Sequence, residues 1–239
     1  MTLDSRGVAV VSGGGSGIGR EVALELARRG YSLALLGRRA EALEETLALA
    51  GLPGASGLAL ACDVRDPQAV EAAVAEVHRR WGAAAVVVPA AGFARLAPVE
   101  EMAPSDFAEV VATNLTGSFL VIRALLSPMK ERGSGWIFPV LSVAARRAFP
   151  GWGAYCASKW GLAGLVAALR EELAGTGVRI TALYPGATDT PIWNGMPGEW
   201  NRAAMVPAAE VARAVGFALD APASALYEEI HLGPAGGAL

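Results

Sequence analysis

The feature of this chain that most constrains its fold is a repeated alternation of short apolar runs with longer segments of helical periodicity. Runs that are apolar along their whole length are typical of strands buried on both faces, as in a parallel sheet covered by crossover helices. The predicted strands are residues 8–12, 32–36, 57–61, 85–88, 135–141, 179–183 and 226–230. The predicted helices are residues 17–29, 40–50, 67–80, 104–131, 154–175 and 207–219. The sequence therefore predicts a doubly wound α/β fold with a parallel sheet of about seven strands and helices on both faces.

Length and composition favour one globular domain over residues 1–239. The chain has 239 residues, of which 53% are hydrophobic and 18% charged, so it can form a large core. A formal charge of -3, without a block of like charges, argues against binding to nucleic acid or to an anionic membrane. The two cysteines and two histidines lack metal-ligand spacing, so no metal site is predicted.

Two segments bear on location and on access to a site. The opening MTLDSRG enters the first strand without a charged and then apolar leader, and the apolar segment AAAVVVPAAGFA is short and interrupted. These features predict a cytoplasmic protein with no membrane span. The longest irregular stretch, residues 185–206, exceeds ordinary loop lengths, and we interpret about 187–206 as a lid or substrate loop.

A glycine-rich loop, SGGGSGIGR, lies between the first predicted strand and the first predicted helix. Glycines permit tight turning and close backbone approach, and the following helix offers free N–H groups to a pyrophosphate. The spacing Gly13-x3-Gly17-x-Gly19 differs from the common G-x-G-x-x-G, and the alternative is a merely tight loop. Its position between strand and helix favours dinucleotide binding.

The second predicted strand ends in LLGRR, which bears on cofactor choice. Sites for NAD usually place a carboxylate near this point for the ribose 2′-hydroxyl, whereas this chain has Gly37, Arg38 and Arg39. An arginine suits a 2′-phosphate in charge and geometry, so NADP(H) is favoured over NAD(H). The alternative is that both arginines are solvated residues at a helix start.

Tyr155 and Lys159 lie four residues apart in the stretch AYCASKWG, and so project from one face of a predicted helix. Alone, such a pair is as well explained by a core-edge tyrosine beside a snorkelling lysine. Ser142, however, stands thirteen residues before Tyr155 at the end of a predicted strand, where ligands sit in open α/β sheets. Asn114 lies on the preceding long helix.

Together these pieces resemble the classical short-chain dehydrogenase/reductase family over nearly the full length. The matching pieces, in the family's order and spacing, are SGGGSGIG, CDV at 62–64, Ala91 with Gly92, Asn114, Ser142, YCASK, and PGATDT at 185–190. The resemblance implies a Rossmann-type domain and an NAD(P)(H)-dependent oxidoreductase. The expected reaction is NADPH-dependent reduction of a carbonyl to an alcohol, or the reverse.

The resemblance also implies roles for four catalytic residues. Tyr155 would be the acid for reduction and the base for oxidation, and Lys159 would favour its phenolate and bind the nicotinamide ribose. Ser142 would hydrogen-bond the substrate oxygen. Asn114 would kink its helix and hold a proton-relaying water, although an irregular helix alone is the alternative.

The cofactor contacts implied by the family positions fall at strand ends and in the loops that follow them. Asp63 would bond the adenine, with a helix N-cap near Asp66 as the alternative, and Thr190 would contact the nicotinamide carboxamide. Cys156 is expected to pack rather than to react. The full predicted set is Ser12, Gly13, Gly15, Ser16, Gly17, Ile18, Gly19, Arg38, Arg39, Asp63, Val64, Ala91, Gly92, Tyr155, Lys159, Pro185, Gly186, Thr188 and Thr190.

Two prolines depart from the family pattern. The family usually has Asn-Asn-Ala-Gly where this chain has Pro89-Ala90-Ala91-Gly92, and often Asn-x-Ser-Ser where it has Pro139-Val140-Leu141-Ser142. Proline lacks an N–H, so each is expected at a strand end or bulge. We hypothesise that the two changes compensate by removing two buried amides together.

The predicted substrate is an apolar ketone, aldehyde or secondary alcohol, because most candidate pocket residues are apolar or aromatic. They are Phe93, Arg95, Val143, Ala144, Phe149, Trp152, Ile192, Trp193, Met196 and Trp200. Packing of the lid or of a subunit contact is the alternative for Trp193, Met196 and Trp200. Arg95, Arg146 and Arg147 are candidates for an anion anchor.

Other functions and the assembly stay open at this stage. A non-catalytic dinucleotide-binding module and a structural protein without cofactor are the alternatives to an enzyme. The resemblance implies a homo-oligomer, a tetramer or dimer, packed through the two long helices. Small residues that would permit close approach, or pack within the subunit, are Ala157, Gly161, Ala163, Gly164 and Ala167.

Overall fold

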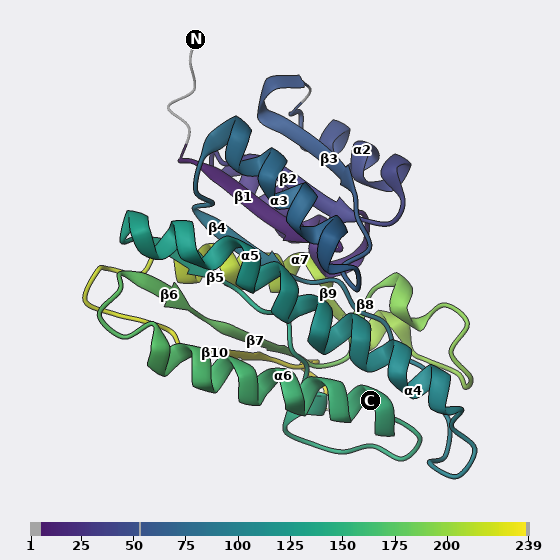
Figure 1. The fold of residues 1–239 in the computed structure, drawn as a ribbon. Helices are drawn as coiled ribbons and strands as arrows, with labels where there is room; N and C mark the ends of the chain where they lie inside the picture. The colour runs from purple at the N-terminus through teal and green to yellow at the C-terminus, as the bar shows by residue number, and fades with distance from the viewer. Residues whose placement is uncertain (1–5, 53, 238–239) are drawn as a thin grey trace.

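The centre of the molecule is a six-stranded parallel sheet with the order β3-β2-β1-β4-β5-β6 (Figure 1). The computed structural model describes residues 6–52 and 54–237, so the stretch MTLDS lies outside the described residues. The strands of the sheet are β1 (Val8–Ser12), β2 (Ser32–Gly37), β3 (Gly57–Ala61), β4 (Val86–Pro89), β5 (Gly135–Ile137) and β6 (Val178–Ile180). The reversal of strand order on either side of β1 creates the crevice in which doubly wound folds bind ligands.

Helices cover both faces of this sheet. Figure 1 shows α5 and α6 on the near face and α7 on the far face. The helices are α1 (Gly17–Arg28), α2 (Ala40–Leu49), α3 (Pro67–Trp81), α4 (Pro104–Val111), α5 (Gly117–Arg132), α6 (Gly153–Glu172) and α7 (Ala208–Leu219). One core cluster joins the sheet to α3, α5 and α6, and the other joins it to α1, α2 and α7. The predicted doubly wound architecture is confirmed.

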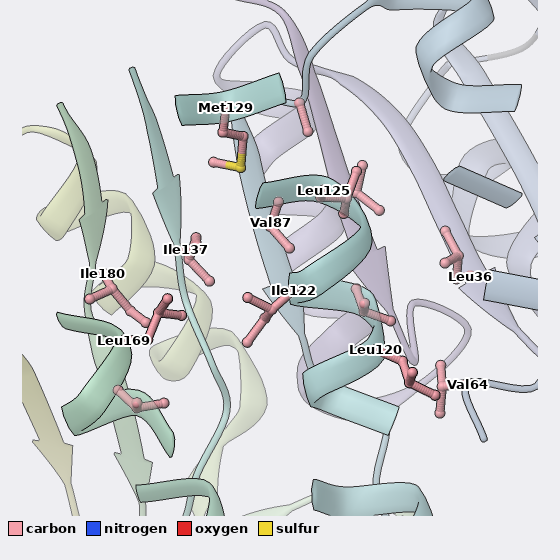
Figure 2. Close-up of a cluster of buried hydrophobic side chains, with 14 of the residues drawn as sticks. Leu36, Val64, Val87, Leu120, Ile122, Leu125, Met129, Ile137, Leu169 and Ile180 are labelled. Atoms are coloured by element: carbon pink, nitrogen blue, oxygen red, sulfur yellow. The ribbon is translucent and has the colours of Figure 1, made fainter. Parts of the chain in front are cut away.

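Strand β1 shows why its residues are all apolar. Val8 and Val10 belong to the core on the α5 side, whereas Val11 belongs to the core on the α1 side, and all three are fully buried. Burial of each such side chain stabilises the fold by about 1.5–3 kcal/mol. Figure 2 shows Ile122 and Leu125 of α5 among the side chains of the first core.

The predicted strand count is wrong in one respect, because the sheet has six strands rather than about seven. Strands β7 (Ala182–Pro185) and β10 (Glu229–Leu232) form a separate parallel pair, so the strand predicted at 226–230 begins later. The predicted strand 179–183 is divided at Thr181 between β6 and β7. The regular ladder of β5 ends at Ile137, because Pro139 has no N–H to donate. Hydrogen bonds continue beyond that break, since Leu183 N donates to Pro139 O at 3.0 Å.

The long helix predicted at 104–131 is interrupted by a π-helical turn, Ala112–Thr116, between α4 and α5. The whole segment Pro104–Arg132 is long and apolar enough, by length and composition, to cross a membrane. Within the fold, α5 packs against α3 and β4, and its apolar face forms the centre of a core cluster. The sequence analysis predicted a helix here but tested only the shorter apolar run around β4 against the length of a membrane span.

The stretch predicted as a lid has local structure at both ends. Strand β8 (Thr188–Asp189) pairs with β9 (Val206–Pro207), and Val206 N donates to Ala187 O at 2.9 Å. Between them lie two short 3₁₀ turns, Pro191–Trp193 and Arg202–Ala204. An ion pair between Arg202 and Asp189 joins the two ends.

Candidate active site

The glycine-rich loop leaves β1 at the carboxyl edge of the sheet and fits against the loop after β4. Gly13 has φ of +70°, and a Cβ there would lie 2.8 Å from the backbone of Ala91. A Cβ on Gly19 would overlap the carbonyl oxygen of Gly13. Ser12 Oγ accepts the N–H groups of Ala90 at 3.2 Å and Ala91 at 3.3 Å, which fixes the two loops together. These close approaches require glycine and leave backbone exposed to a ligand.

The N-terminus of α1 is suited to a phosphate. Ser16 is its N-cap residue but makes no side-chain capping bond, and the first turn carries no acidic residue. The free N–H groups and positive helix end therefore face the crevice uncompensated. Arg20, which sequence reasoning missed, braces the loop: its Nη2 donates to Gly15 O at 2.7 Å, and it pairs with Glu45 at 2.7 Å. No local pattern could reveal a contact across 25 residues.

Arg38 and Arg39 follow β2 and are exposed. Within the described part of the chain neither guanidinium has a hydrogen bond or ion pair, and the Arg39 side chain does not cap α2. Both are free to bind an anion. The charge of Arg38 contributes to the lowered pKa of Asp63, so the two side chains lie in one electrostatic environment.

Asp63 follows β3 and is held by Arg65. The Arg65 backbone N donates to Asp63 Oδ1 at 3.0 Å, and Arg65 Nη2 lies 2.6 Å from Asp63 Oδ2. These hydrogen bonds lower the pKa of Asp63, so its carboxylate is ionised at neutral pH. The N-cap of α3 is Asp66, whose side chain accepts from Gln68 N at 2.9 Å. The helix-cap alternative therefore applies to Asp66 and leaves Asp63 for another role.

The side chains of two predicted cofactor residues point into packed interior. Val64 is buried, and a Cβ on Gly117 would lie 2.6 Å from its Cγ2. Ile18 packs against the core on the α1 side. The Val64 side chain is therefore withdrawn from a ligand, whereas Ile18 stays partly exposed.

The two prolines that depart from the family pattern lie at or just beyond strand ends, as predicted. Pro89 is the last residue of β4, and Pro139 lies just beyond β5. The segments are neighbours, because Val140 N donates to Pro89 O at 3.0 Å. Compensation between the two substitutions stays a hypothesis about cofactor affinity.

Asn114 lies in the π-helical turn, so the helix irregularity expected there is present. Its fully buried side chain accepts from Phe93 N at 3.0 Å and donates to Phe93 O at 2.9 Å. It also donates to Ser158 Oγ at 3.0 Å. These bonds fasten the loop after β4 to α6 beside Lys159. A Cβ on Gly92 would lie 3.0 Å from Asn114 Oδ1 and 3.8 Å from Lys159 Nζ.

Tyr155, on the first turn of α6, is buried and meets Ser142 at the start of the 3₁₀ turn Val143–Ala145. Burial raises the pKa of Tyr155 to about 12, with a hydrogen bond from Ser142 acting in the opposite direction. Ser142 Oγ also accepts from Ala144 N at 3.1 Å. The phenol is therefore protonated at neutral pH.

Lys159 lies one turn along α6 with its Nζ 5.6 Å from the centre of the Tyr155 ring. Its Nζ donates to Val140 O at 2.8 Å, and the side chain is 5% exposed. Burial lowers the pKa of Lys159 to about 8, which still leaves the amine charged near neutrality.

The segment after β7 completes the crevice. Gly186 N donates to Leu232 O at 2.6 Å, and Thr188 Oγ1 donates to Gly186 O at 3.0 Å. A Cβ on Gly17 would lie 3.2 Å from Thr190 Cβ, so Thr190 sits against the glycine-rich loop. The predicted residues of the first and last loops are thus brought together.

Aromatic side chains line the approach to Tyr155. Trp152 contacts the Tyr155 ring edge-on at 5.5 Å and Trp193 at 5.9 Å, and Trp193 contacts Trp200 at 4.6 Å. Trp193 Nε1 donates to Thr188 O at 2.8 Å, which fixes its ring. Phe149, Trp152, Ile192 and Ala94 pack against the small cluster of Ala144, Tyr155 and Cys156.

The comparisons with known proteins match this geometry. The family model described as short chain dehydrogenase matches residues 7–199 of the chain. The chain belongs to the short-chain dehydrogenase family. It is 34% identical to a sepiapterin reductase of Chlorobaculum tepidum, over 96% of this chain and 97% of that protein. It is 37% identical to a D-threitol dehydrogenase of Mycolicibacterium smegmatis, over 82% and 77% of the two chains.

A solved structure extends the likeness to three dimensions. The crystal structure of an actinorhodin polyketide ketoreductase with NADPH superposes with a TM-score of 0.87 at 32% identity, covering 98% of this chain and 97% of that one. This short-chain dehydrogenase is accordingly an NAD(P)-dependent oxidoreductase that acts on CH–OH or C=O groups. The crevice described above fits such a dinucleotide, since it combines a glycine cradle, an uncompensated helix N-terminus and unpaired arginines.

Proposed function

We propose that this short-chain dehydrogenase reduces a carbonyl to an alcohol with NADPH, and that Tyr155 is its general acid, or its base in the reverse direction. The observation that carries the proposal is the buried Tyr155 between Ser142 and Lys159. Its raised pKa of about 12 keeps the phenol protonated at neutral pH, the state required to give a proton to a developing alkoxide.

The chain's own residues divide the work around the substrate oxygen. Ser142 Oγ donates a hydrogen bond to that oxygen, and Tyr155 delivers the proton. The charge of Lys159 stabilises the phenolate that remains. Asn114 holds the loop after β4 in place and, as in the family, would position a water for proton return.

The cofactor would lie across the carboxyl ends of the strands. Residues 13–19 and the N-terminus of α1 would hold its pyrophosphate, Asp63 its adenine, and Lys159 a ribose hydroxyl. Pro185, Gly186, Thr188 and Thr190 would enclose the nicotinamide end. When bound, the reduced nicotinamide supplies the hydride.

A preference for NADP(H) rests on the guanidinium groups of Arg38 and Arg39, which have no partner among the described residues, and on the absence of an acid at the end of β2. The ketoreductase that superposes on this chain was solved with NADPH. Replacing both arginines by alanine should raise the Kd for NADPH about tenfold or more and leave that for NADH nearly unchanged. Fluorescence titration measures both constants.

Arg213→Ala is a matched control, because Arg213 is an exposed arginine on α7 that pairs with Glu210. It should bind both nucleotides like the wild type. An equal loss of NADH and NADPH binding in the double variant would contradict the 2′-phosphate role.

The proposal also covers the substrate and the setting of the enzyme. Residues 1–239 form one catalytic domain with a lid at about 187–206, and the aromatic approach to Tyr155 suits an apolar reacting end of the substrate. Cys62 and Cys156 are free, buried thiols, which fits a reducing, cytoplasmic location. A homo-oligomer, dimer or tetramer, is supported by exposed aromatic residues on the long helices.

A further inference from the structure

We propose that the far end of the substrate occupies a side cavity beyond the aromatic approach, and that Glu101 and Asp106 select a substrate whose far end carries hydrogen-bond donors and no anion. This inference rests on the proposed function, because it assigns the substrate class of the same site. The donors could be hydroxyl or ammonium groups, which share the ability to bind a carboxylate.

The cavity has a volume of about 280 Å³ and lies between the loop after β4 and the lid. Ala94 lines it on one side and also packs against the cluster that contains Tyr155. Met196 lines it on the other side, just after Trp193. Ala97 N donates to Gly151 O at 3.0 Å, which fastens the cavity wall to the segment before α6. The walls are therefore continuous with the segments that flank Tyr155.

Among the described residues that line the cavity, the one cation, Arg95, is already neutralised by ion pairs. Arg95 lies 3.2 Å from Asp106 and 3.3 Å from Glu109, and its guanidinium stands over the Phe93 ring at 5.7 Å. Glu101 lines the same cavity and has no ion pair within residues 6–52 and 54–237. Two carboxylates and one paired guanidinium leave the lining with excess negative charge, which repels an anion and attracts donor groups.

The other arginines considered as anion anchors do not line this cavity. Arg146 is directed elsewhere, since its Nη2 donates to Tyr184 Oη at 2.8 Å and pairs with Glu229. Arg147 stacks on Phe149 at 5.3 Å and is absent from the cavity lining. The proposed substrate therefore combines an apolar reacting end with a far end that meets charged groups.

The test uses methyl ketones of graded chain length that end in a methyl, hydroxyl, ammonium or carboxylate group. We expect kcat/KM with NADPH to rank ammonium and hydroxyl above methyl, and carboxylate last. Glu101→Gln and Asp106→Asn should each reduce the ammonium-to-carboxylate ratio roughly fivefold. Glu100→Gln, at the neighbouring residue outside the cavity lining, should leave the ratio unchanged.

The inference is overturned if the carboxylate ketone is the best substrate, or if Glu101→Gln and Asp106→Asn leave the ratio at its wild-type value. Failure of the proposed function would look different, because no ketone, including the methyl-terminated one, would then oxidise NADPH. In that case the order of preference for the end groups is measured as binding. The corresponding alcohols are titrated into the protein mixed with NADP⁺, and tryptophan fluorescence reports their Kd values. The same order supports the cavity's selectivity, and the reverse order or absence of binding overturns it.

Discussion

At the scale of single residues, the proposed reaction depends on two buried groups whose pKa values are displaced in opposite directions. Burial raises the pKa of Tyr155 to about 12 and lowers that of Lys159 to about 8. Over the neutral range the phenol keeps its proton while the amine keeps its charge, which is the combination that reduction requires. The roles proposed for this tyrosine and lysine therefore rest on their burial as well as on their spacing along one helix face.

The lowered pKa of Lys159 predicts the alkaline limit of reduction. As pH rises through about 8, Lys159 loses the proton that stabilises the developing phenolate, so kcat/KM for reduction should fall about tenfold per pH unit above that value. The arginine of Lys159→Arg keeps its charge throughout this range, so the alkaline fall in kcat/KM should move to higher pH. Initial rates of NADPH oxidation across pH measure the effect. If kcat/KM of Lys159→Arg falls at the same pH as that of the wild type, a group other than Lys159 causes the fall.

At the scale of elements, the glycine-rich turn before α1 is the part with least tolerance for side chains. Gly19→Ala should raise the Kd for NADPH at least about tenfold and lower the Tm, because the new Cβ overlaps Gly13 O. Gly164→Ala on α6 is the matched control, since a Cβ there meets nothing within 4 Å. It should leave NADPH binding unchanged. Normal binding by Gly19→Ala would show that the turn can move without loss.

The elements that sequence could predict are those with local signals. Strand β1 and helix α1 were predicted to within a residue, because an apolar run and a glycine cluster mark them directly. The π-helical turn Ala112–Thr116 leaves no periodic signal, and its position follows from contacts of Asn114 with residues far along the chain. The division of the strand at Thr181 has the same kind of origin, in hydrogen bonds around Pro139.

The residues of the candidate site also divide into those with a local sequence signal and those set by contacts far along the chain. Motif spacing together with the family resemblance selected Ser142, Tyr155 and Lys159, which lie together in the fold. The pair of Arg20 with Glu45 and the pair of Arg65 with Glu109 were missed, because each joins residues far apart in the sequence. The ion pairs of Arg95 also have no sequence pattern. They leave excess negative charge at the proposed far end of the substrate pocket, where an anion anchor had been a candidate.

At the scale of the whole molecule, three exposed aromatic residues lie on the consecutive helices α4, α5 and α6. Phe107, Phe119 and Trp160 are 44%, 41% and 50% exposed on α4, α5 and α6. Gly161 is used inside the subunit, since a Cβ there would lie 2.7 Å from Leu115 Cδ2, whereas the surroundings of Gly164 are open. An apolar surface over neighbouring helices is typical of an interface between copies.

Trp160→Lys should therefore reduce the proposed oligomer to smaller species at micromolar concentration, because it places a charge in a contact that would exclude water. Light scattering after size-exclusion chromatography measures the mass. Leu49→Lys is the control, since Leu49 is 61% exposed on α2, away from these helices. A wild-type protein that is already monomeric would refute the assembly.

The most direct test of the central claim is NADPH binding and ketone-dependent NADPH oxidation by the wild type and by Tyr155→Phe. The wild type should bind NADPH more tightly than NADH and oxidise it with an apolar methyl ketone. Tyr155→Phe should bind NADPH with a similar Kd and lose about a thousandfold in kcat, because the proton donor is gone while the cradle is intact. Undiminished turnover by Tyr155→Phe, or no binding of either nucleotide by the wild type, would contradict the assignment.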